Sequence, residues 1–204
     1  MKNTIFFAAL VLALIAVFAA PARADGLILR GGMNFANAKT DPEIDEDNQR
    51  FRLGGNAALL GELGDGGVRL LVGGGYEQRG LKVTSGSNEG KMSLDYITVP
   101  VMISVGTSST AEFVPRLFVN LGVEPAFLVS SKVAFGAFTS DFDAEEFDFG
   151  LRGEVGMELP VSASAGLYLG GGYSQSLTDA IKGDDLESKS YNFHLFAGVK
   201  IGMF

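Results

Sequence analysis

Residues 147–161 read FDFGLRGEVGMELPV, and every second side chain of this stretch is apolar or glycine. The apolar set is Phe147, Phe149, Leu151, Gly153, Val155, Met157, Leu159 and Val161, and the set between them includes Asp148, Arg152, Glu154 and Glu158. A period of two residues is that of a β-strand, in which neighbouring side chains point to opposite faces. The stretch therefore predicts a long strand with one apolar face and one charged face.

The same alternation recurs from Leu27 to the end of the chain. It predicts eight strands, at residues 27–37, 50–62, 67–79, 92–105, 115–129, 146–159, 165–177 and 189–203. These segments are longer than soluble strands, which have about 5–6 residues, and they reach the roughly 9–11 residues that a membrane-crossing strand needs. The pattern predicts an all-β fold, an eight-stranded antiparallel up-and-down transmembrane β-barrel.

The connections between these strands are expected to alternate in length. Residues 38–49, 80–91, 130–145 and 178–188 form long polar connections, whereas those after the second, fourth and sixth strands are shorter. Outer-membrane barrels combine long outer loops with short periplasmic turns. The rhythm and the even strand number therefore favour such a barrel, with both chain ends in the periplasm.

The charged face of the strands is rich in glycine and carries cations and anions in equal number. Its expected members are Arg30, Arg52, Arg69, Arg79, Arg152, Lys200, Glu62, Glu77, Glu124, Asp148, Glu154 and Glu158. Eight strands enclose room only for side chains, and a cation facing lipid near the midplane would cost about 2–4 kcal/mol. We therefore expect this face to form a structural charge network inside the lumen, while the apolar face contacts lipid. A soluble periplasmic barrel with its apolar face inward has the same period and is the alternative.

The first residues have the features of an export signal. Lys2 precedes an apolar run at residues 5–20, which is followed by Ala22, Arg23 and Ala24. A positive start, an apolar middle and a small-x-small end are typical of a secretory signal peptide. We expect residues 1–24 to be cleaved and residues 25–204 to form the outer-membrane β-barrel domain.

The composition excludes several function classes. The chain of 204 residues has a net charge of −8, no cysteine and a single histidine. Its acidity argues against nucleic acid as a partner, because phosphate binding needs a basic face. The absence of cysteine excludes thiol catalysis and thiolate metal sites, and one histidine makes metal catalysis unfavourable. We expect no metal and no cofactor, and a monomer whose partners are outer-membrane lipids.

Several short motifs carry a resemblance to a known family. They are a Tyr-x-x-x-Pro pattern within residues 95–101, Gly31-Gly32-Met33-Asn34-Phe35, residues 75–81 (GYEQRGL), Leu121-Gly122-Val123-Glu124-Pro125, and the closing residues 198–204 (GVKIGMF). In this order the chain resembles the PorT-like bacterial outer-membrane β-barrel proteins. The resemblance implies an eight-stranded barrel, exported through the periplasm to the outer membrane of a Gram-negative-type bacterium. The final Phe204 also looks like the signal that the barrel assembly machinery recognises, which implies that machinery as a partner during biogenesis.

The leading hypothesis is an integral outer-membrane barrel with a charge-plugged lumen and a structural or interaction role at the cell envelope. The alternatives are a narrow pore for small solutes and a lipid-modifying enzyme. A Ser–His–acid enzyme would need His194 as its base, but no Gly-x-Ser-x-Gly elbow supplies a nucleophile, so we expect no catalytic site. Acidic residues at 41–47, 141–146 and 184–187 lack EF-hand spacing, and we interpret them as solvated loops. The alternative is that they bind Ca²⁺ or Mg²⁺, which would bridge them to lipid phosphates.

Overall fold

The computed structural model describes residues 25–41, 49–64, 66–85, 88–107, 114–136, 138–142, 144–178 and 187–202. The predicted signal peptide, the final Phe204 and the acidic residues at 43–47 and 184–185 lie outside these ranges. Within the described ranges, no helix has the length and apolar character needed to cross a membrane.

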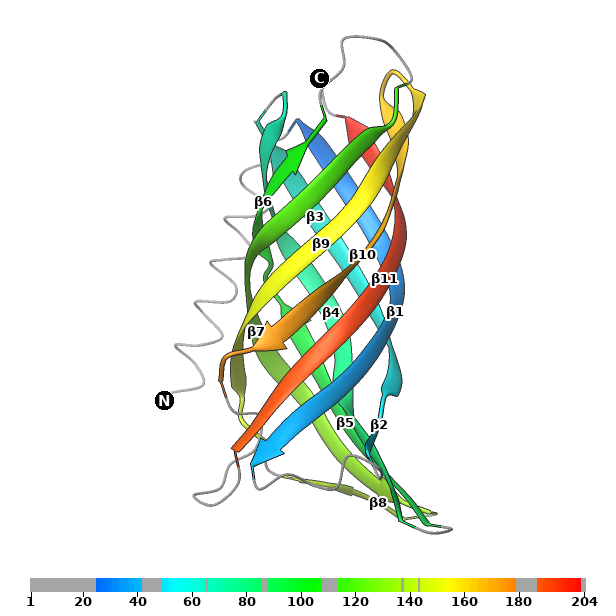
Figure 1. The fold of residues 1–204 in the computed structure, drawn as a ribbon, viewed down its shortest axis with the longest axis vertical. Coiled ribbons are helices and arrows are strands. Elements are labelled where there is room, and N and C mark those ends of the chain that lie inside the picture. Colours follow the sequence, from blue (N-terminus) through cyan, green and yellow to red (C-terminus); the bar gives the residue numbers. More distant parts are fainter. Residues whose placement is uncertain are drawn as a thin grey trace.

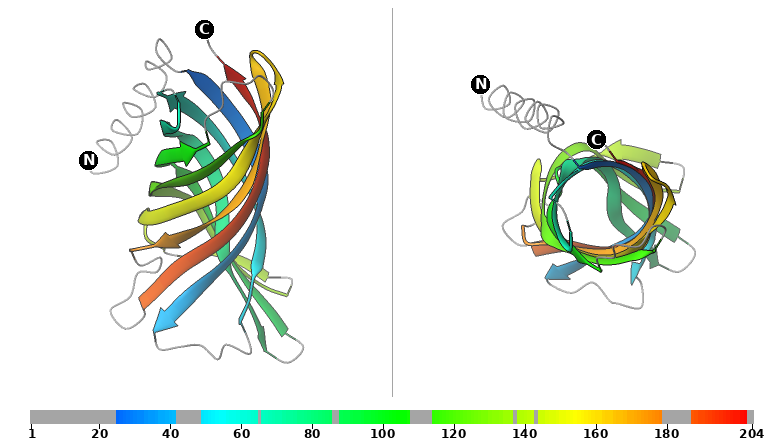
Figure 2. Two further views of the ribbon diagram at one scale, coloured as in Figure 1. Left: turned by 45° about the horizontal axis from the view of Figure 1, so that its top comes forward. Right: turned by 90° about the horizontal axis from the view of Figure 1, so that it is seen from above.

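The described chain forms a closed antiparallel β-barrel (Figure 1). Its strands are β1 (Gly26–Asp41), β2 (Gln49–Arg50), β3 (Arg52–Leu63), β4 (Val68–Ser85), β5 (Asn88–Thr98), β6 (Val101–Gly106), β7 (Arg116–Phe135), β8 (Phe138–Asp141), β9 (Phe147–Ser162), β10 (Ala165–Ser176) and β11 (Glu187–Gly202). β1 pairs with β3 on one side and with β11 on the other, so the sheet closes on itself, as the view down the axis shows (Figure 2). In hydrocarbon this closure matters because it leaves no strand edge with unpaired backbone groups.

The strands β5 and β6 are two halves of one barrel strand, which makes the number of barrel strands eight, as the sequence predicts. Together they fill the gap between β4 and β7. The break falls at Val99 and Pro100, because proline has no N–H to donate to the ladder. The carbonyl of Pro100 still accepts a hydrogen bond from the N–H of Gly73, and Val99 donates to Pro125, so the barrel stays closed there.

At two of the four predicted long loops, residues 80–91 and 130–145, the structure has strand extensions instead. The predicted loop at 80–91 is a continuous hairpin, since β4 runs to Ser85 and β5 begins at Asn88. Strand β7 runs to Phe135 and pairs back with β8, and these extensions project together at the lower end of Figure 1. The loop prediction was wrong here because backbone pairing continues beyond the apolar band, where hydropathy no longer marks a strand.

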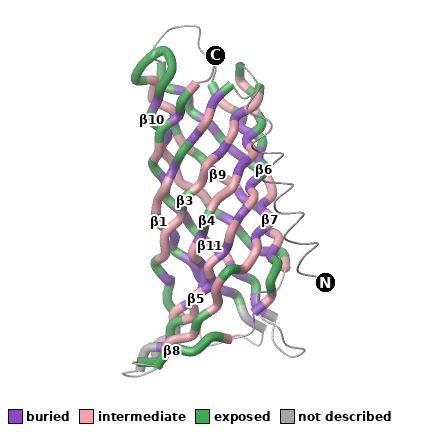
Figure 3. Tube along the Cα trace, turned by 180° about the vertical axis from the view of Figure 1, so that it is seen from behind, coloured by how far each residue is buried: buried purple, intermediate pink, exposed green. Residues whose placement is uncertain are grey.

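Burial alternates along the strands in the way that the sequence predicts (Figure 3). On β9, Leu151 and Val155 are 51% and 60% exposed on the outside, whereas Arg152 and Glu154 are 6% and 2% exposed on the inside. The barrel therefore presents an apolar exterior and encloses its charges. The short turn between β3 and β4 contains Gly66, whose φ of 67° is a conformation that glycine adopts without strain.

Candidate functional site: the barrel lumen

The centre of the lumen is organised around Arg152 on β9. Its Nε donates to Glu154 Oε1 at 2.7 Å, and its Nη1 donates to Glu77 Oε2 at 2.9 Å. Nη1 also contacts the carboxylate of Glu124. Because Glu77 lies on β4 and Glu124 on β7, the guanidinium of Arg152 links these two strands to β9.

Arg79 on β4 is the centre of a second set of ion pairs, beside those of Arg152. Its Nε lies 2.7 Å from Glu77 Oε1, its Nη2 lies 2.7 Å from Glu124 Oε1, and its Nη1 lies 2.5 Å from Asp148 Oδ2. The guanidinium also lies over the ring of Tyr96, 5.0 Å from the centroid. Glu77 and Glu124 are thus shared by Arg79 and Arg152, which makes one continuous network.

Arg30 on β1 extends this network to the opposite wall. Its two terminal nitrogens donate to the two oxygens of Glu154, both at 2.8 Å. Asn120 donates to the same carboxylate at 3.0 Å. His194 Nε2 lies 3.3 Å from Glu154 Oε1, and the imidazole is 1% exposed. Glu154 therefore accepts hydrogen bonds from Arg30, Arg152 and Asn120, as a buried carboxylate must if it is to remain charged.

A smaller cluster lies toward the end of the barrel at which β1 begins and β11 ends. Lys200 Nζ lies 2.6 Å from Glu62 Oε1 and 3.0 Å from Glu158 Oε1. Arg69 Nη1 lies 2.8 Å from Glu62 Oε1 and 3.6 Å from Glu158 Oε2. These side chains are more accessible than those of the central network, with Arg69 18% and Lys200 10% exposed.

Of the twelve predicted network residues, the structure brings all but Arg52 into these two groups of ion pairs. Arg52 is buried and donates from Nη1 to the backbone carbonyl of Arg79 at 2.5 Å. It has no carboxylate within ion-pair distance among the described residues. Arg52 therefore lies beside the network and contacts it only through the backbone of Arg79.

Sequence reasoning missed an apolar layer that crosses the lumen between the two charged groups. Phe118 stacks on Tyr168 with ring centroids 4.6 Å apart, and Tyr168 stacks on Phe196 at 5.7 Å. The buried side chains of Ile28, Leu60, Leu71 and Met102 complete the layer. The sequence did contain a signal for this layer. Phe118 lies two residues before Asn120, and Phe196 lies two residues after His194, so a strand places both rings on the inward face.

Inward glycines make room for this layer. A Cβ at Gly156 would lie 2.5 Å from Phe118 Cζ, and one at Gly170 would lie 2.7 Å from Phe196 Cζ. The rings therefore occupy space that any other residue at these positions would fill. This explains why glycines alternate with large inward side chains in the sequence.

Arg116, the first residue of β7, is another inward cation that sequence reasoning missed. It is 7% exposed, and its Nη2 donates to Ser104 Oγ at 3.2 Å. Its Nε and Nη1 have no hydrogen-bond partner among the described residues.

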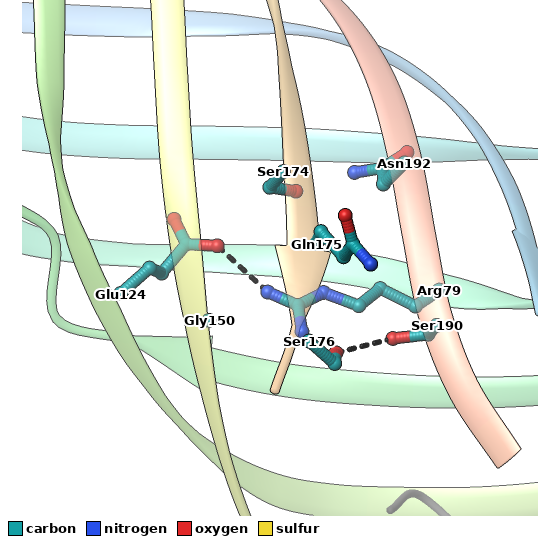
Figure 4. Close-up of a pocket in the computed structure, with 8 residues that line it drawn as sticks. All are labelled: Arg79, Glu124, Gly150, Ser174, Gln175, Ser176, Ser190 and Asn192. Atoms are coloured by element: carbon teal, nitrogen blue, oxygen red, sulfur yellow. Dashed lines mark hydrogen bonds and ion pairs between the residues drawn. The ribbon is translucent and has the colours of Figure 1, made fainter. Parts of the chain in front are cut away.

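A recess beside the central network is small and polar (Figure 4). It is lined by Arg79, Glu124, Gly150, Ser174, Gln175, Ser176, Ser190 and Asn192, and its empty volume is about 170 Å³ with open solvent included. Figure 4 shows Arg79 facing Glu124 across it, and the hydroxyls of Ser176 and Ser190 lie 2.6 Å apart. A recess of this size is below the roughly 300–1,000 Å³ of typical ligand pockets.

The surroundings of His194 do not form a hydrolytic site. Its contacts are the Glu154 carboxylate and the ring of Phe196, and within the described chain neither ring nitrogen has a hydrogen-bond partner. A nucleophile–base pair requires a hydroxyl or thiol within hydrogen-bond reach of the imidazole. In the same described part of the chain, no group of three or more His, Cys, Asp and Glu side chains could hold a metal ion.

Aromatic side chains gather on the outer surface, near one end of the apolar band. Tyr173 packs on Phe193 with centroids 5.1 Å apart, and Phe51 meets Tyr191 edge to face at 6.1 Å. Tyr76 and Tyr173 are about one-third exposed, at 36% and 37%. Such side chains suit the boundary between hydrocarbon and headgroups.

Comparison with known proteins agrees with this architecture. The family model described as outer membrane protein beta-barrel domain matches residues 26–182. Among solved structures, the chain is similar to Neisserial surface protein A, with 13% identity, a TM-score of 0.54, and coverage of 87% of this chain and 97% of that chain. It is also similar to OprG from Pseudomonas aeruginosa (11% identity, TM-score 0.48, coverage 89% and 98%) and to the attachment invasion locus protein Ail of Yersinia pestis (15%, 0.46, 88% and 99%). No curated protein matches the chain.

Proposed function

The chain belongs to the family of outer membrane protein β-barrel domains, and on this basis we propose that it is a closed barrel whose lumen is plugged by its own ion pairs. It then has a structural or interaction role at the cell envelope. The surfaces available for this role are the barrel exterior and the strand extensions. Its partners are outer-membrane lipids and, during biogenesis, the barrel assembly machinery, and it acts as a monomer. The motif from Tyr96 to Pro100, which ends at the break between β5 and β6, supports a PorT-like relationship within the family.

The observation that carries the plug is the shared binding of Glu77 and Glu124 by Arg79 and Arg152. A solute crossing the lumen would have to separate several buried ion pairs at once. Removing one partner of a buried pair costs about 3–5 kcal/mol, because the remaining charge is left uncompensated. The aromatic layer formed by Phe118, Tyr168 and Phe196 is a second obstruction along the lumen.

Planar-bilayer recording tests the plug directly. The purified full-length barrel is expected to give no large steady conductance, and Arg152→Ala is expected to create or raise one. Thr139→Ala, on the exposed strand β8, is the matched control and should leave the recording unchanged. A large, steady conductance of the unmodified protein would refute the plug.

A narrow pore is the second candidate, and buried polar atoms in the lumen support it. Asn120 Oδ1, Asn192 Oδ1 and His194 Nδ1 have no protein partner among the described residues. Buried polar atoms of this kind are commonly satisfied by water. If water threads the lumen, Glu154→Ala and Arg152→Ala should both increase a small conductance that the unmodified barrel already has.

A further inference from the structure

Arg116 is a buried guanidinium that has no carboxylate partner among the described residues. The residue is 7% exposed, and its Nη2 donates a hydrogen bond to Ser104 Oγ at 3.2 Å. Its Nε and Nη1 are buried and have no hydrogen-bond partner in the part of the chain that the structure describes. A buried charge without a partner is strongly unfavourable, and proteins therefore pair such charges. The counter-charge of Arg116 must come from outside the described residues.

The carboxylates of the smaller cluster are already occupied by other cations. Glu158 on β9 is directly opposite Arg116 in the strand register. Its Oε1 nevertheless lies 3.0 Å from Lys200 Nζ, and its Oε2 lies 3.6 Å from Arg69 Nη1. Glu62 Oε1 lies 2.6 Å from the same lysine and 2.8 Å from the same arginine. With Arg116 included, three cations face two carboxylates, which leaves one positive charge in excess at this end of the lumen.

The central network cannot balance this charge, because the aromatic layer lies in between. The ring of Phe118, the next inward residue on β7 after Arg116, belongs to that layer. Beyond it, Glu154 is directly opposite Asn120, which lies four residues along β7 from Arg116, or about 13 Å at 3.3 Å per residue. Glu154 is also bound already by both terminal nitrogens of Arg30. The excess charge is therefore local to Arg116 and the smaller cluster.

The fold holds the guanidinium of Arg116 in one place. A Cβ at Gly106 on β6 would lie 2.7 Å from Arg116 Cζ, so the guanidinium occupies space that only a glycine at position 106 leaves open. The hydrogen bond to Ser104, which is 1% exposed, fixes its other side. The neighbouring side chains of Arg69 and Glu158 are 18% and 14% exposed. A small solute can therefore reach this end of the lumen from solution.

We propose that Arg116 binds a single small monovalent anion, of the chemistry of a halide ion. One negative charge matches the excess of one positive charge, and the nitrogens Nε and Nη1 supply charged donors, which make strong hydrogen bonds. The adjacent carboxylates of Glu62 and Glu158 would repel a multiply charged anion such as phosphate. This site lies apart from the central network that plugs the lumen, so the two proposals can fail separately.

The first test measures stability in chloride and in gluconate, an anion that is too large for a buried site. Urea unfolding is carried out in neutral detergent, where both ends of the barrel meet the same solution. For a site with a Kd of about 15 mM, exchange of about 150 mM chloride for gluconate lowers the folded-to-unfolded ratio roughly tenfold. R116Q should show no such dependence, whereas R50Q, which removes an exposed arginine on β2, should respond like the unmodified barrel.

The two media also give opposite orders of stability. In gluconate R116Q should be at least as stable as the unmodified barrel, because an unpaired buried charge has been removed. In chloride this advantage should disappear, since the bound anion stabilises only the protein that retains Arg116. Heat-dependent gel migration verifies that each variant is folded.

The second test locates the ion. Crystals of the unmodified barrel grown in sodium bromide should show an anomalous peak within hydrogen-bond distance of Arg116 Nε or Nη1. The absence of bromide from this position would overturn the proposal, because water or an internal carboxylate would then satisfy the guanidinium. An equal response of R116Q and the unmodified barrel to chloride, or no response of either, would overturn it as well.

Discussion

Arg30 and Glu154 form a bidentate ion pair between β1 and β9, with both nitrogen–oxygen distances at 2.8 Å. Strand β1 is bordered by β3 and β11, so this pair connects walls that are not neighbours in the sheet. Both side chains are almost fully buried, at 2% and 0% exposed. The pair therefore braces the barrel across its lumen in addition to balancing charge.

Replacement of Arg30 by alanine should destabilise the barrel by about 3–5 kcal/mol, because Glu154 loses its bidentate partner in a buried site. The measurement is urea unfolding of the barrel in lipid vesicles, followed by circular dichroism. Arg69→Ala serves as the control, since Arg69 is 18% exposed and water can replace part of its interaction. Equal losses in the two variants would contradict the bracing role of Arg30.

A methyl group at Gly156 should also destabilise the barrel. The new Cβ would lie 2.5 Å from Phe118 Cζ and 2.3 Å from the carbonyl oxygen of Leu169, so both a ring and the backbone must move. Overpacking of this kind costs about 1–3 kcal/mol. Gly31→Ala is the matched control, because its nearest neighbour would be the Asn56 carbonyl oxygen at an ordinary 3.5 Å. Thermal unfolding of both variants measures the difference, and equal transition temperatures would argue against tight packing at Gly156.

Much of this architecture follows from alternation alone. The period of two residues predicts which side chains of β9 point inward, including Arg152 and Glu154. It also predicts the eight barrel strands, because lipid imposes a long apolar face on each of them. It does not predict which charges pair, since Arg30 and Glu154 are brought together only by barrel closure and shear.

Two features escaped the prediction from sequence for different physical reasons. The hairpin of β4 and β5 extends to Ser85 and Asn88 through backbone pairing in water, where no apolar face is required. The layer of Phe118 and Tyr168 was overlooked because an apolar side chain on the inward face contradicts the expectation of a purely polar lumen. In a narrow barrel, close packing can be satisfied by rings as well as by ion pairs.

The strand extensions should face the cell exterior, and cysteine labelling can test this orientation. The chain has no cysteine of its own, so an introduced thiol gives the only signal. Thr139→Cys on β8 should react with a membrane-impermeant maleimide on intact cells, because β8 is exposed and lies among the extensions. Ser164→Cys, exposed in the turn between β9 and β10, should react only after the outer membrane is permeabilised. Labelling of Ser164→Cys alone on intact cells would reverse the assigned orientation.

The exterior of the barrel should respond to charge according to depth. Val155 is 60% exposed near the middle of β9, and Val161 is 62% exposed near its end. An arginine facing lipid costs about 2–4 kcal/mol at the bilayer midplane and about 0–1 kcal/mol near the interfaces. Val155→Arg should therefore lower the free energy of unfolding in vesicles far more than Val161→Arg, although the two side chains are equally accessible. Water around both positions would remove the difference, so equal stability of the two variants in vesicles would contradict a lipid-facing exterior. In neutral detergent micelles, which adapt to a charged side chain, we expect the gap between the variants to narrow but keep its sign.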